Sequence, residues 1–194
     1  MPFFTNHLLA IGNWIMKKLL LSALLLTSFS AQAADVDSAS MLSAHNDWRT
    51  KVGSPALTWS NSLQTEAQNW ANSLKAKGCG MKHSTGASGE NLYWASAQKS
   101  ATSKDAAGNW IWKNSLQTVS DKKVTDSWGS EQQWYDYASN QCNAPVGKAC
   151  GHYTQVVWKD TKEVGCANAV CDDFSQIWVC NYAPAGNMVG KKPY

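Results

Sequence analysis

The chain has 194 residues, of which 44% are hydrophobic and only 16% are charged, and its formal net charge at pH 7 is +3. A nearly neutral chain without a block of basic residues does not have the composition of a nucleic-acid-binding protein. The length is sufficient for one domain with a substantial core, and beyond the N-terminal region we expect no transmembrane segment.

The N-terminal region has the three parts of a secretory signal peptide. The basic segment Met16–Lys18 precedes the apolar run Leu19–Leu26, and the small-residue sequence Ala31-Gln32-Ala33 follows. We therefore predict a leader and signal peptide over residues 1–33, with Met16 as the true start, and a single domain over residues 34–194. We expect the mature protein outside the cytoplasm, in an extracellular or periplasmic location.

Removal of this leader changes the charge balance. The leader holds two of the 17 basic residues and none of the 14 acidic residues, so residues 34–194 carry a formal charge of +1. The expected mature chain is thus close to neutral, which again argues against a nucleic-acid partner.

All six cysteines follow the expected cleavage point, and an even number in an exported chain is typical of three disulfides. The C-x₂-C spacing of structural zinc sites is absent. Spacing alone leaves 15 pairings open, although two pairs that are close in sequence could each close a local loop or hairpin. The cysteines are Cys79, Cys142, Cys150, Cys166, Cys171 and Cys180.

Two helices are predicted at the start of the expected domain. Apolar residues recur at helical spacing over residues 38–52, and Gly53-Ser54-Pro55 ends that segment. A second apolar stripe runs through residues 60–77 and ends at Gly78.

The next long segment, residues 95–123, has a different composition. Its first part reads ASAQKSATSKDAAGN, which is rich in Ala, Ser and Lys and has no apolar period. We predict a mobile surface loop, with Trp110 and Trp112 holding its far end against the body.

The rest of the chain combines one more helix with strands. A third helix is expected over residues 124–137, although Gly129 weakens it. The runs Val164–Ala169 and Gln176–Tyr182 are rich in β-branched and aromatic residues and predict a hairpin. Because helices come first and strands mostly later, the fold class is expected to be α+β.

Histidines are few in the expected domain. His45 lies on the apolar stripe of the first helix, so we expect a packed, hydrogen-bonded core residue. His83 lies in a turn rich in Gly and Ser. His152 opens the aromatic and β-branched run GHYTQVVW, which has the composition of buried structure.

Two carboxylates stand out beside these histidines. Glu90 lies in a Gly-Glu-Asn segment that leads directly into Leu-Tyr-Trp. Glu131 comes three residues after Trp128 and four before Tyr135, so on a helix it would share a face with the aromatic residues. A carboxylate on a buried face is costly unless it is paired, and the two remaining histidines are the obvious partners.

An ordered series of motifs extends over nearly the whole expected domain. Together these motifs resemble the CAP superfamily, which comprises cysteine-rich secretory proteins, antigen 5 and pathogenesis-related proteins. The plant pathogenesis-related class and its secreted bacterial relatives are the most similar. The motifs are HNDWR at 45–49, HS at 83–84, GENL at 89–92, Trp128 with Glu131, NQC at 140–142, GHYTQVVW at 151–158 and CNYAPAGN at 180–187.

The resemblance has definite structural implications. It implies a three-layer α-β-α sandwich around a small, mainly antiparallel sheet. It implies three disulfides, which are Cys79–Cys166, Cys142–Cys150 and Cys171–Cys180. It also implies a central cleft lined by two histidines and two glutamates, whose matching positions are His83, Glu90, Glu131 and His152.

Two features depart from the plant pattern. Seven positions separate His83 from Glu90, slightly more than we expect of a plant-type member. Residues 95–123 also look like an insertion of about two dozen residues, where connections typically have ~4–6 residues. Because this insertion lies between two expected cleft residues, it could shape or cover the cleft.

The four cleft residues allow three functional hypotheses. Two imidazoles and two carboxylates could hold zinc, as some family members do at the matching histidines, or they could form a structural hydrogen-bond network. The two glutamates could instead serve a hydrolase, as an acid/base pair or through a metal-activated water. Other family members bind sterols or lipids in an apolar groove, and the many tryptophans could supply such a surface.

We rank a secreted, non-catalytic binding module first, with a lipid, a sterol or another extracellular ligand as its partner. A metal-dependent hydrolase is the alternative. Zinc is the only cofactor that the residues suggest. We expect a monomer with neither a nucleic-acid partner nor a transmembrane segment.

Overall fold

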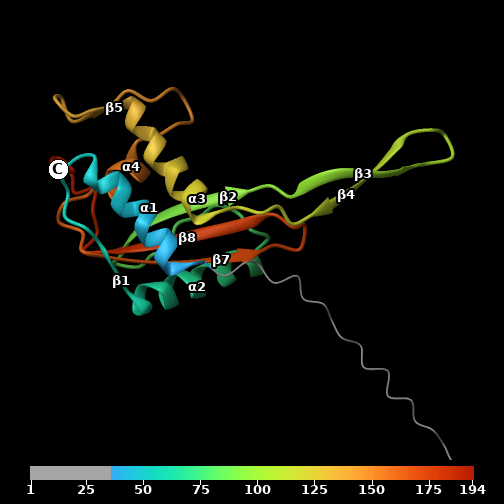
Figure 1. Cartoon of the computed structure of the whole chain (residues 1–194), viewed down its shortest axis with the longest axis horizontal. Coiled ribbons are helices and arrows are strands. Elements are labelled where there is room, and N and C mark those ends of the chain that lie inside the picture. Colours follow the sequence, from blue (N-terminus) through green and yellow to red (C-terminus); the bar gives the residue numbers. More distant parts are fainter. Residues whose placement is uncertain (1–35) are drawn as a thin grey trace, which may run out of the picture. The chain divides into compact units, whose positions relative to one another are not determined.

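The computed structural model describes residues 36–194, so the predicted leader over residues 1–33 lies outside the described residues. A four-stranded sheet separates one helix on one face from three helices on the other (Figure 1). This confirms the predicted α+β class and the three-layer α-β-α sandwich. Within residues 36–194, no helix has the length and apolarity needed to cross a bilayer.

The sheet has the strand order β1-β7-β8-β2. Strand β8 pairs antiparallel with β7 and with β2, and only the short β1 pairs in parallel, so the sheet is mainly antiparallel as expected. The predicted hairpin near the C-terminus is confirmed as β7 and β8. The strands of this sheet are β1 Thr58–Trp59, β2 Gly89–Ala95, β7 Glu163–Val170 and β8 Gln176–Ala183.

Helix α2 (Asn61–Ala76) covers one face of the sheet and confirms the predicted second helix. Its small buried residues Ala67 and Ala71 pack against Ile177 and Val179 of β8. Gly165 of β7 permits this close packing, because a Cβ there would lie 2.2 Å from the Gln64 nitrogen and 2.5 Å from the Ser60 oxygen.

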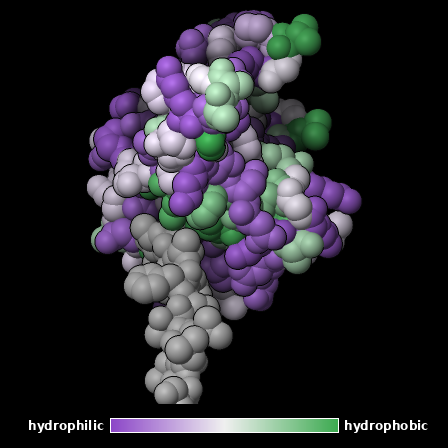
Figure 2. Space-filling model, turned by 90° about the vertical axis from the view of Figure 1, so that its right-hand side faces the viewer, coloured by the Kyte–Doolittle hydropathy of each residue, from purple (hydrophilic) through white to green (hydrophobic). Residues whose placement is uncertain are grey.

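The other face of the sheet carries α1 (Ser38–Thr50), α3 (Asp121–Gly129) and α4 (Gly151–Val156) (Figure 1). These helices enclose the larger hydrophobic core, to which Met41, Trp128 and Tyr153 contribute. The viewed face in Figure 2 is mostly hydrophilic, with hydrophobic residues in small separate groups. Apolar residues that the sequence places at helical spacing are buried, among them Met41 and Ala44 of α1 and Leu63 and Leu74 of α2.

The third helix differs in extent from its prediction over residues 124–137. It begins at Asp121, where the Ser120 hydroxyl accepts a hydrogen bond from the Lys123 backbone N–H at 3.2 Å. It ends at Gly129, which lies against the Trp48 ring, and a 3₁₀ turn over Ser130–Trp134 continues the chain. Glu131 is therefore on a 3₁₀ turn rather than on the helix itself. Two short strands, β5 (Tyr135–Asp136) and β6 (Gln141–Cys142), form a separate ribbon after it.

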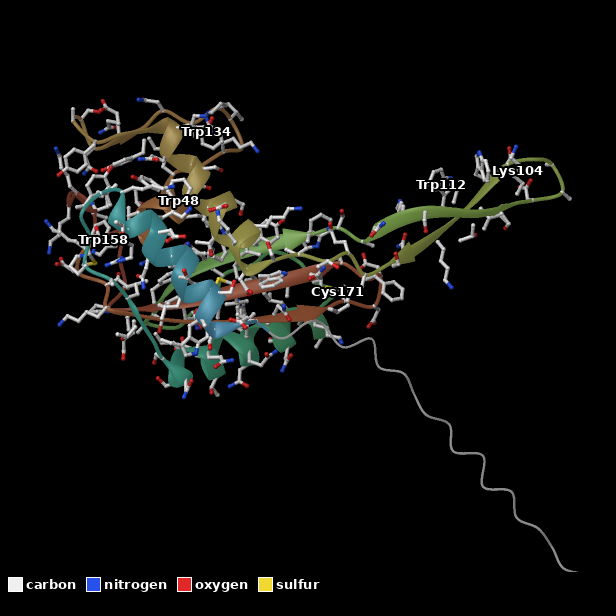
Figure 3. All side chains as sticks on the ribbon, viewed as in Figure 1. Trp48, Lys104, Trp112, Trp134, Trp158 and Cys171 are labelled. Atoms are coloured by element: carbon white, nitrogen blue, oxygen red, sulfur yellow. A yellow bond between two sulfur atoms is a disulfide. The ribbon has the colours of Figure 1, made fainter. Side chains whose placement is uncertain are left out.

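The prediction of a loop over residues 95–123 is wrong. Most of it is an antiparallel hairpin of β3 (Gln98–Lys104) and β4 (Trp110–Ser115), which extends away from the rest of the domain (Figures 1 and 3). Trp110 and Trp112 do not hold it against the body, because their exposed fractions are 56% and 61%.

Two of the three implied disulfide pairings are also wrong. The structure confirms Cys142–Cys150, but it joins Cys79 to Cys171 and Cys166 to Cys180, not Cys79 to Cys166 and Cys171 to Cys180. The β7–β8 register places Cys166 directly opposite Cys180, with their Cα atoms 4.1 Å apart. Cys79 follows α2 and lies 6.2 Å, between Cα atoms, from Cys171 at the β7–β8 turn.

Candidate functional site

His152 is held by a glutamate from another element. The imidazole is on the first turn of α4, and its Nδ1 lies 2.7 Å from Oε1 of Glu131. The other oxygen, Oε2, accepts hydrogen bonds from the backbone N–H groups of His152 at 3.0 Å and Tyr153 at 3.2 Å. Glu131 thus satisfies backbone donors that an isolated helix end leaves unpaired, and it fixes the orientation of the imidazole.

His83 and Glu90 form a second pair of the same kind. Nδ1 of His83 lies 2.7 Å from Oε1 of Glu90, which also accepts a hydrogen bond from the Ser84 backbone N–H at 3.0 Å. The Glu90 side chain is only 6% exposed, whereas that of His83 is 61% exposed. Oε2 of Glu90 is buried and has no hydrogen-bond partner among the described residues.

The two pairs meet at one pocket of about 240 Å³. His83, Glu90 and His152 line this pocket, and Glu131 does not, because it lies behind His152. In each pair Nδ1 faces a carboxylate, so a neutral imidazole carries its proton on Nδ1 and keeps the Nε2 lone pair free. We call this pocket, with its two histidine–glutamate pairs, the His–Glu cleft.

Asn91 is a cleft residue that sequence reasoning missed. It lines the pocket, and its side-chain Nδ2 donates to the His152 carbonyl oxygen at 3.1 Å and to the Tyr182 hydroxyl at 3.2 Å. Trp128 also supports the cleft, because its ring stacks on the His152 ring at a centroid separation of 6.5 Å. Asn91 directly follows Glu90 in the Gly-Glu-Asn segment. Its position next to a candidate cleft residue was the one sequence feature that could have indicated its role.

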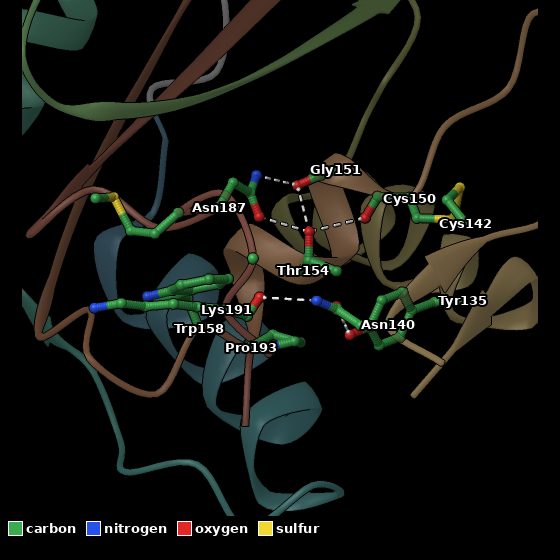
Figure 4. A pocket seen from close by; sticks show the side chains of 12 residues that line it. Tyr135, Asn140, Cys142, Cys150, Gly151, Thr154, Trp158, Asn187, Lys191 and Pro193 are labelled. Carbon is green, nitrogen blue, oxygen red and sulfur yellow. Dashed lines mark hydrogen bonds between the residues drawn. A yellow bond between two sulfur atoms is a disulfide. The ribbon is translucent and has the colours of Figure 1, made fainter. Parts of the chain in front are cut away.

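Asn187 is a second missed residue, and it connects the His–Glu cleft to a neighbouring pocket. Its Oδ1 accepts from the Thr154 hydroxyl at 2.6 Å, and its Nδ2 donates to the Gly151 carbonyl oxygen at 2.8 Å (Figure 4). Asn187 and Gly151 line both pockets. The neighbouring pocket has a volume of about 310 Å³, and its apolar walls include Trp158 and Pro193.

The ligand set of the cleft is incomplete for a closed metal centre. Within the part of the chain that the structure describes, no three His, Cys, Asp or Glu side chains are grouped so that they could hold one ion. Structural zinc sites use four protein ligands, and catalytic sites typically use three. A metal ion in this pocket would have the two carboxylate-oriented imidazoles as protein ligands, and solvent or a bound ligand would have to complete its coordination.

Comparison with known proteins identifies the family. The family model described as CAP, the cysteine-rich secretory protein family, matches residues 42–182. The chain belongs to the CAP family. This CAP chain is 41% identical to the pathogenesis-related protein PRMS of Zea mays over 154 residues, which is 79% of this chain and 80% of that protein. It is 38% identical to pathogenesis-related protein 1B of Nicotiana tabacum over 181 residues, 93% of each chain.

Solved structures confirm the CAP fold. Venom allergen-like protein 4 of Schistosoma mansoni superposes with a TM-score of 0.55 at 22% identity, over 81% of this chain and 92% of that one. The crystal structure of NaASP2 with Zn²⁺ superposes with a TM-score of 0.57, also at 22% identity, over 81% of this chain and 84% of that one. The predicted resemblance to plant pathogenesis-related proteins is confirmed by the two sequence relatives.

Proposed function

We propose that this CAP protein is an exported, non-catalytic binding module whose His–Glu cleft is the ligand site. The observation that carries the proposal is the position of Glu131 behind His152, with both carboxylate oxygens already accepting hydrogen bonds. Two carboxylates that flank a substrate are the basis of glycosidase-type chemistry. Here only Glu90 lines the pocket, which favours binding over hydrolysis.

The first ligand that the cleft would take is a divalent transition metal ion such as zinc. Nε2 of His83 and Nε2 of His152 would be its ligands, with Glu90 and Glu131 holding the rings in place. Carboxylates that bond the far nitrogen of a ligand histidine strengthen metal binding in this way. A bound ion would supply a Lewis-acidic contact for a polar group of an extracellular ligand. The solved structure of NaASP2 is one with Zn²⁺, which supports the same chemistry here.

The second candidate ligand is a lipid or sterol in the pocket beside the cleft. Its volume of about 310 Å³ is at the lower end of the range for small-molecule sites, and aromatic side chains form part of its wall. Such a pocket would hold one part of a lipid molecule. This binding would survive removal of the cleft histidines, which separates it from metal binding.

The disulfides support export of the mature protein, and therefore a binding role outside the cytoplasm. Three disulfides are formed among the six cysteines, and disulfides persist mainly in oxidising compartments. The family to which the chain belongs is that of the cysteine-rich secretory proteins, which agrees with export. Mass spectrometry of the mature protein recovered from the periplasm or the medium would show whether the chain begins after Ala33.

Zinc titration calorimetry tests the metal part of the proposal. We expect a dissociation constant in the micromolar range for the wild type, no measurable binding by His152→Ala or His83→Ala, and roughly 10–100-fold weaker binding by Glu131→Gln. Glu163→Gln is the matched control, because Glu163 is an exposed glutamate at the start of β7. Protons compete for the same nitrogen lone pair, so the affinity should fall as the pH is lowered from about 7 to 5.

Failure of this test has a clear meaning. If wild-type protein binds no zinc at micromolar concentrations at any pH, the metal part is wrong and the histidine–glutamate pairs are structural. His152→Ala would then mainly lower stability, by about 1–3 kcal/mol, because the hydrogen bonds of Glu131 would be left incomplete. Turnover of any defined substrate that depends on Glu90 would overturn the non-catalytic assignment.

A further inference from the structure

The β3–β4 hairpin is an arm that stands apart from the core of the domain. Every residue of β3 is exposed, and so is every residue of β4 except Asn114, which is partly buried. Two side-chain hydrogen bonds hold its base in place. Asn114 Nδ2 donates to the Asp173 carbonyl oxygen at 3.3 Å, and Gln117 Nε2 donates to the Ser96 carbonyl oxygen at 2.5 Å. The arm is thus attached firmly at one end and surrounded by solvent along its length (Figure 3).

One face of the arm combines tryptophan with lysine. Residues directly opposite in an antiparallel pair share a face, and the register pairs Trp110 with Lys104 and Trp112 with Ala101. The bulge between Ala101 and Ser103 keeps Lys104 on the tryptophan face. Nζ of Lys104 lies 4.8 Å from the centroid of the Trp110 ring, a cation–π contact. Figure 3 labels Lys104 and Trp112 along this projecting segment.

The arm also concentrates positive charge. Residues 98–115 contain three lysines, Lys99, Lys104 and Lys113, and one acid, Asp105, so their formal charge is +2. Residues 34–194 together carry only +1, so the rest of that chain is slightly acidic. Asp105 is used within the turn, where its Oδ1 accepts from the backbone N–H groups of Ala107 and Asn109 at 2.9 Å. The lysines therefore dominate the charge that the arm presents.

We propose that this arm docks on an anionic lipid surface, with the rings of Trp110 and Trp112 in the headgroup region and Lys99 and Lys104, which share their face, at the phosphates. Tryptophan is suited to this boundary because a large apolar ring carries one polar N–H. Lysine is suited to it because its apolar stem can lie beside the rings while the ammonium group stays at the charged surface. The docking surface is separate from the His–Glu cleft.

Charge decides between this partner and a second copy of the chain. Both outer edges of the two-stranded ribbon are unpaired in the sheet order, so pairing of two arms is geometrically conceivable. Pairing of two arms would place two segments of formal charge +2 against each other, and lysines on edge strands oppose such pairing. An anionic surface is complementary to the arm, and a second arm is not.

Vesicle flotation and tryptophan fluorescence of the processed protein test the proposal. We expect binding to vesicles of phosphatidylglycerol and phosphatidylcholine to be at least tenfold stronger than to phosphatidylcholine alone, with weaker binding at high salt. Trp110→Ser with Trp112→Ser should reduce it at least tenfold, and Lys99→Gln with Lys104→Gln should remove the preference for anionic lipid, because both lysines lie on the tryptophan face. Trp94→Ser is the matched control, because Trp94 is 45% exposed but lies on β2 of the central sheet.

Three results would overturn the proposal. The first is no binding to anionic vesicles at micromolar protein. The second is vesicle binding that the double tryptophan variant retains, or binding to soluble dextran sulfate that is as strong as binding to vesicles. Either result would show that the arm acts only as a patch of positive charge. The third is a dimer in light scattering that the double tryptophan variant abolishes. Thermal melting of the variants should match the wild type, because the two rings make no core contacts.

Discussion

The hydroxyl of Tyr182 lies 2.9 Å from Nε2 of His45, and both side chains are fully buried. Nδ1 of His45 lies 2.8 Å from the Met41 carbonyl oxygen, which can only accept a hydrogen bond, so the imidazole proton is on Nδ1. Nε2 therefore accepts from Tyr182, and the Tyr182 hydroxyl accepts from Asn91. The prediction that His45 is a packed, hydrogen-bonded core residue is confirmed. This hydrogen-bond arrangement requires that the imidazole is neutral.

This arrangement predicts a loss of stability in mild acid. Burial lowers the pKa of His45 to about 4 from its ordinary value of 6.5. Between these pH values the unfolded chain takes up a proton that the folded chain does not, so the free energy of unfolding rises with pH across this window. We expect about 3 kcal/mol to be lost as the pH falls from 6.5 to 4, with no further loss from this group below 4.

Urea denaturation of wild type and His45→Gln at pH 7.5 to 4 measures this effect. The variant should be less stable at neutral pH, and the gap between the two curves should narrow as the pH falls. Parallel curves would show that His45 does not titrate differently in the folded and unfolded states.

The disulfide pairing gives a second prediction. Peptide mapping of the oxidised protein should recover Cys79 joined to Cys171 across a separation of 92 residues, and Cys166 joined to Cys180. The chain-entropy model assigns a disulfide across a loop of this length about 4–5 kcal/mol of stability. Cys79→Ser with Cys171→Ser should lower the free energy of unfolding by this order. A Cys79–Cys166 peptide in the map would contradict the pairing.

The approach of α2 to the sheet gives a third prediction. Gly165→Ala should destabilise the fold by about 1–3 kcal/mol or more, because the added Cβ would meet backbone atoms rather than a flexible side chain. Gly80→Ala is the control, since a Cβ at Gly80 would meet no atom within 4 Å. Chemical denaturation of both variants decides the matter, and equal stabilities would show that α2 can shift without cost.

Arg49 gives a fourth prediction. Its guanidinium group is fully buried. It donates hydrogen bonds to the carbonyl oxygens of four residues, which are Pro55 at 2.6 Å, Val156 at 3.0 Å, Trp158 at 2.9 Å and Thr161 at 3.0 Å. Burial lowers the pKa of Arg49 to about 10. Arg49→Lys should cost about 3 kcal/mol, because an ammonium group does not reproduce the planar fork of donors.

Denaturation of Arg49→Lys beside Lys159→Arg measures this cost. Lys159 is an exposed residue of the loop that follows α4, so its exchange keeps the positive charge and changes only the shape of the cationic group, away from any buried network. An Arg49→Lys protein as stable as the wild type would show that the four carbonyl groups find other donors.

Much of the fold was predictable because its core elements bury one face. Apolar spacing located α1, α2 and the β7–β8 hairpin. The β3–β4 arm was missed because a ribbon exposed on both faces needs no apolar alternation, and β3 consists of polar and small residues. The cysteine pairing depends on the β7–β8 register, which places Cys166 opposite Cys180. The spacing of the cysteines along the sequence does not reveal this register.

The candidate site was predictable to a similar degree. His83, Glu90 and His152 were found from unusual surroundings and family motifs, and all three line one pocket. Glu131 was expected beside them, yet its carboxylate acts from behind the histidine. Asn91 and Asn187 were missed because an uncharged amide gives no sign of a site in the sequence, and its role follows only from its hydrogen bonds in the structure.

The reach of Arg49 along the chain also determines when folding can finish. Its guanidinium group is on the first helix, while three of its four acceptors come from residues 107, 109 and 112 positions later. A nascent chain that has not yet exposed its last third cannot provide these acceptors. Contacts of such separation slow folding, because a long loop must close before they form. Arg49 is therefore synthesised early in the domain, but its hydrogen bonds can be completed only after the segment that holds these acceptors has been synthesised.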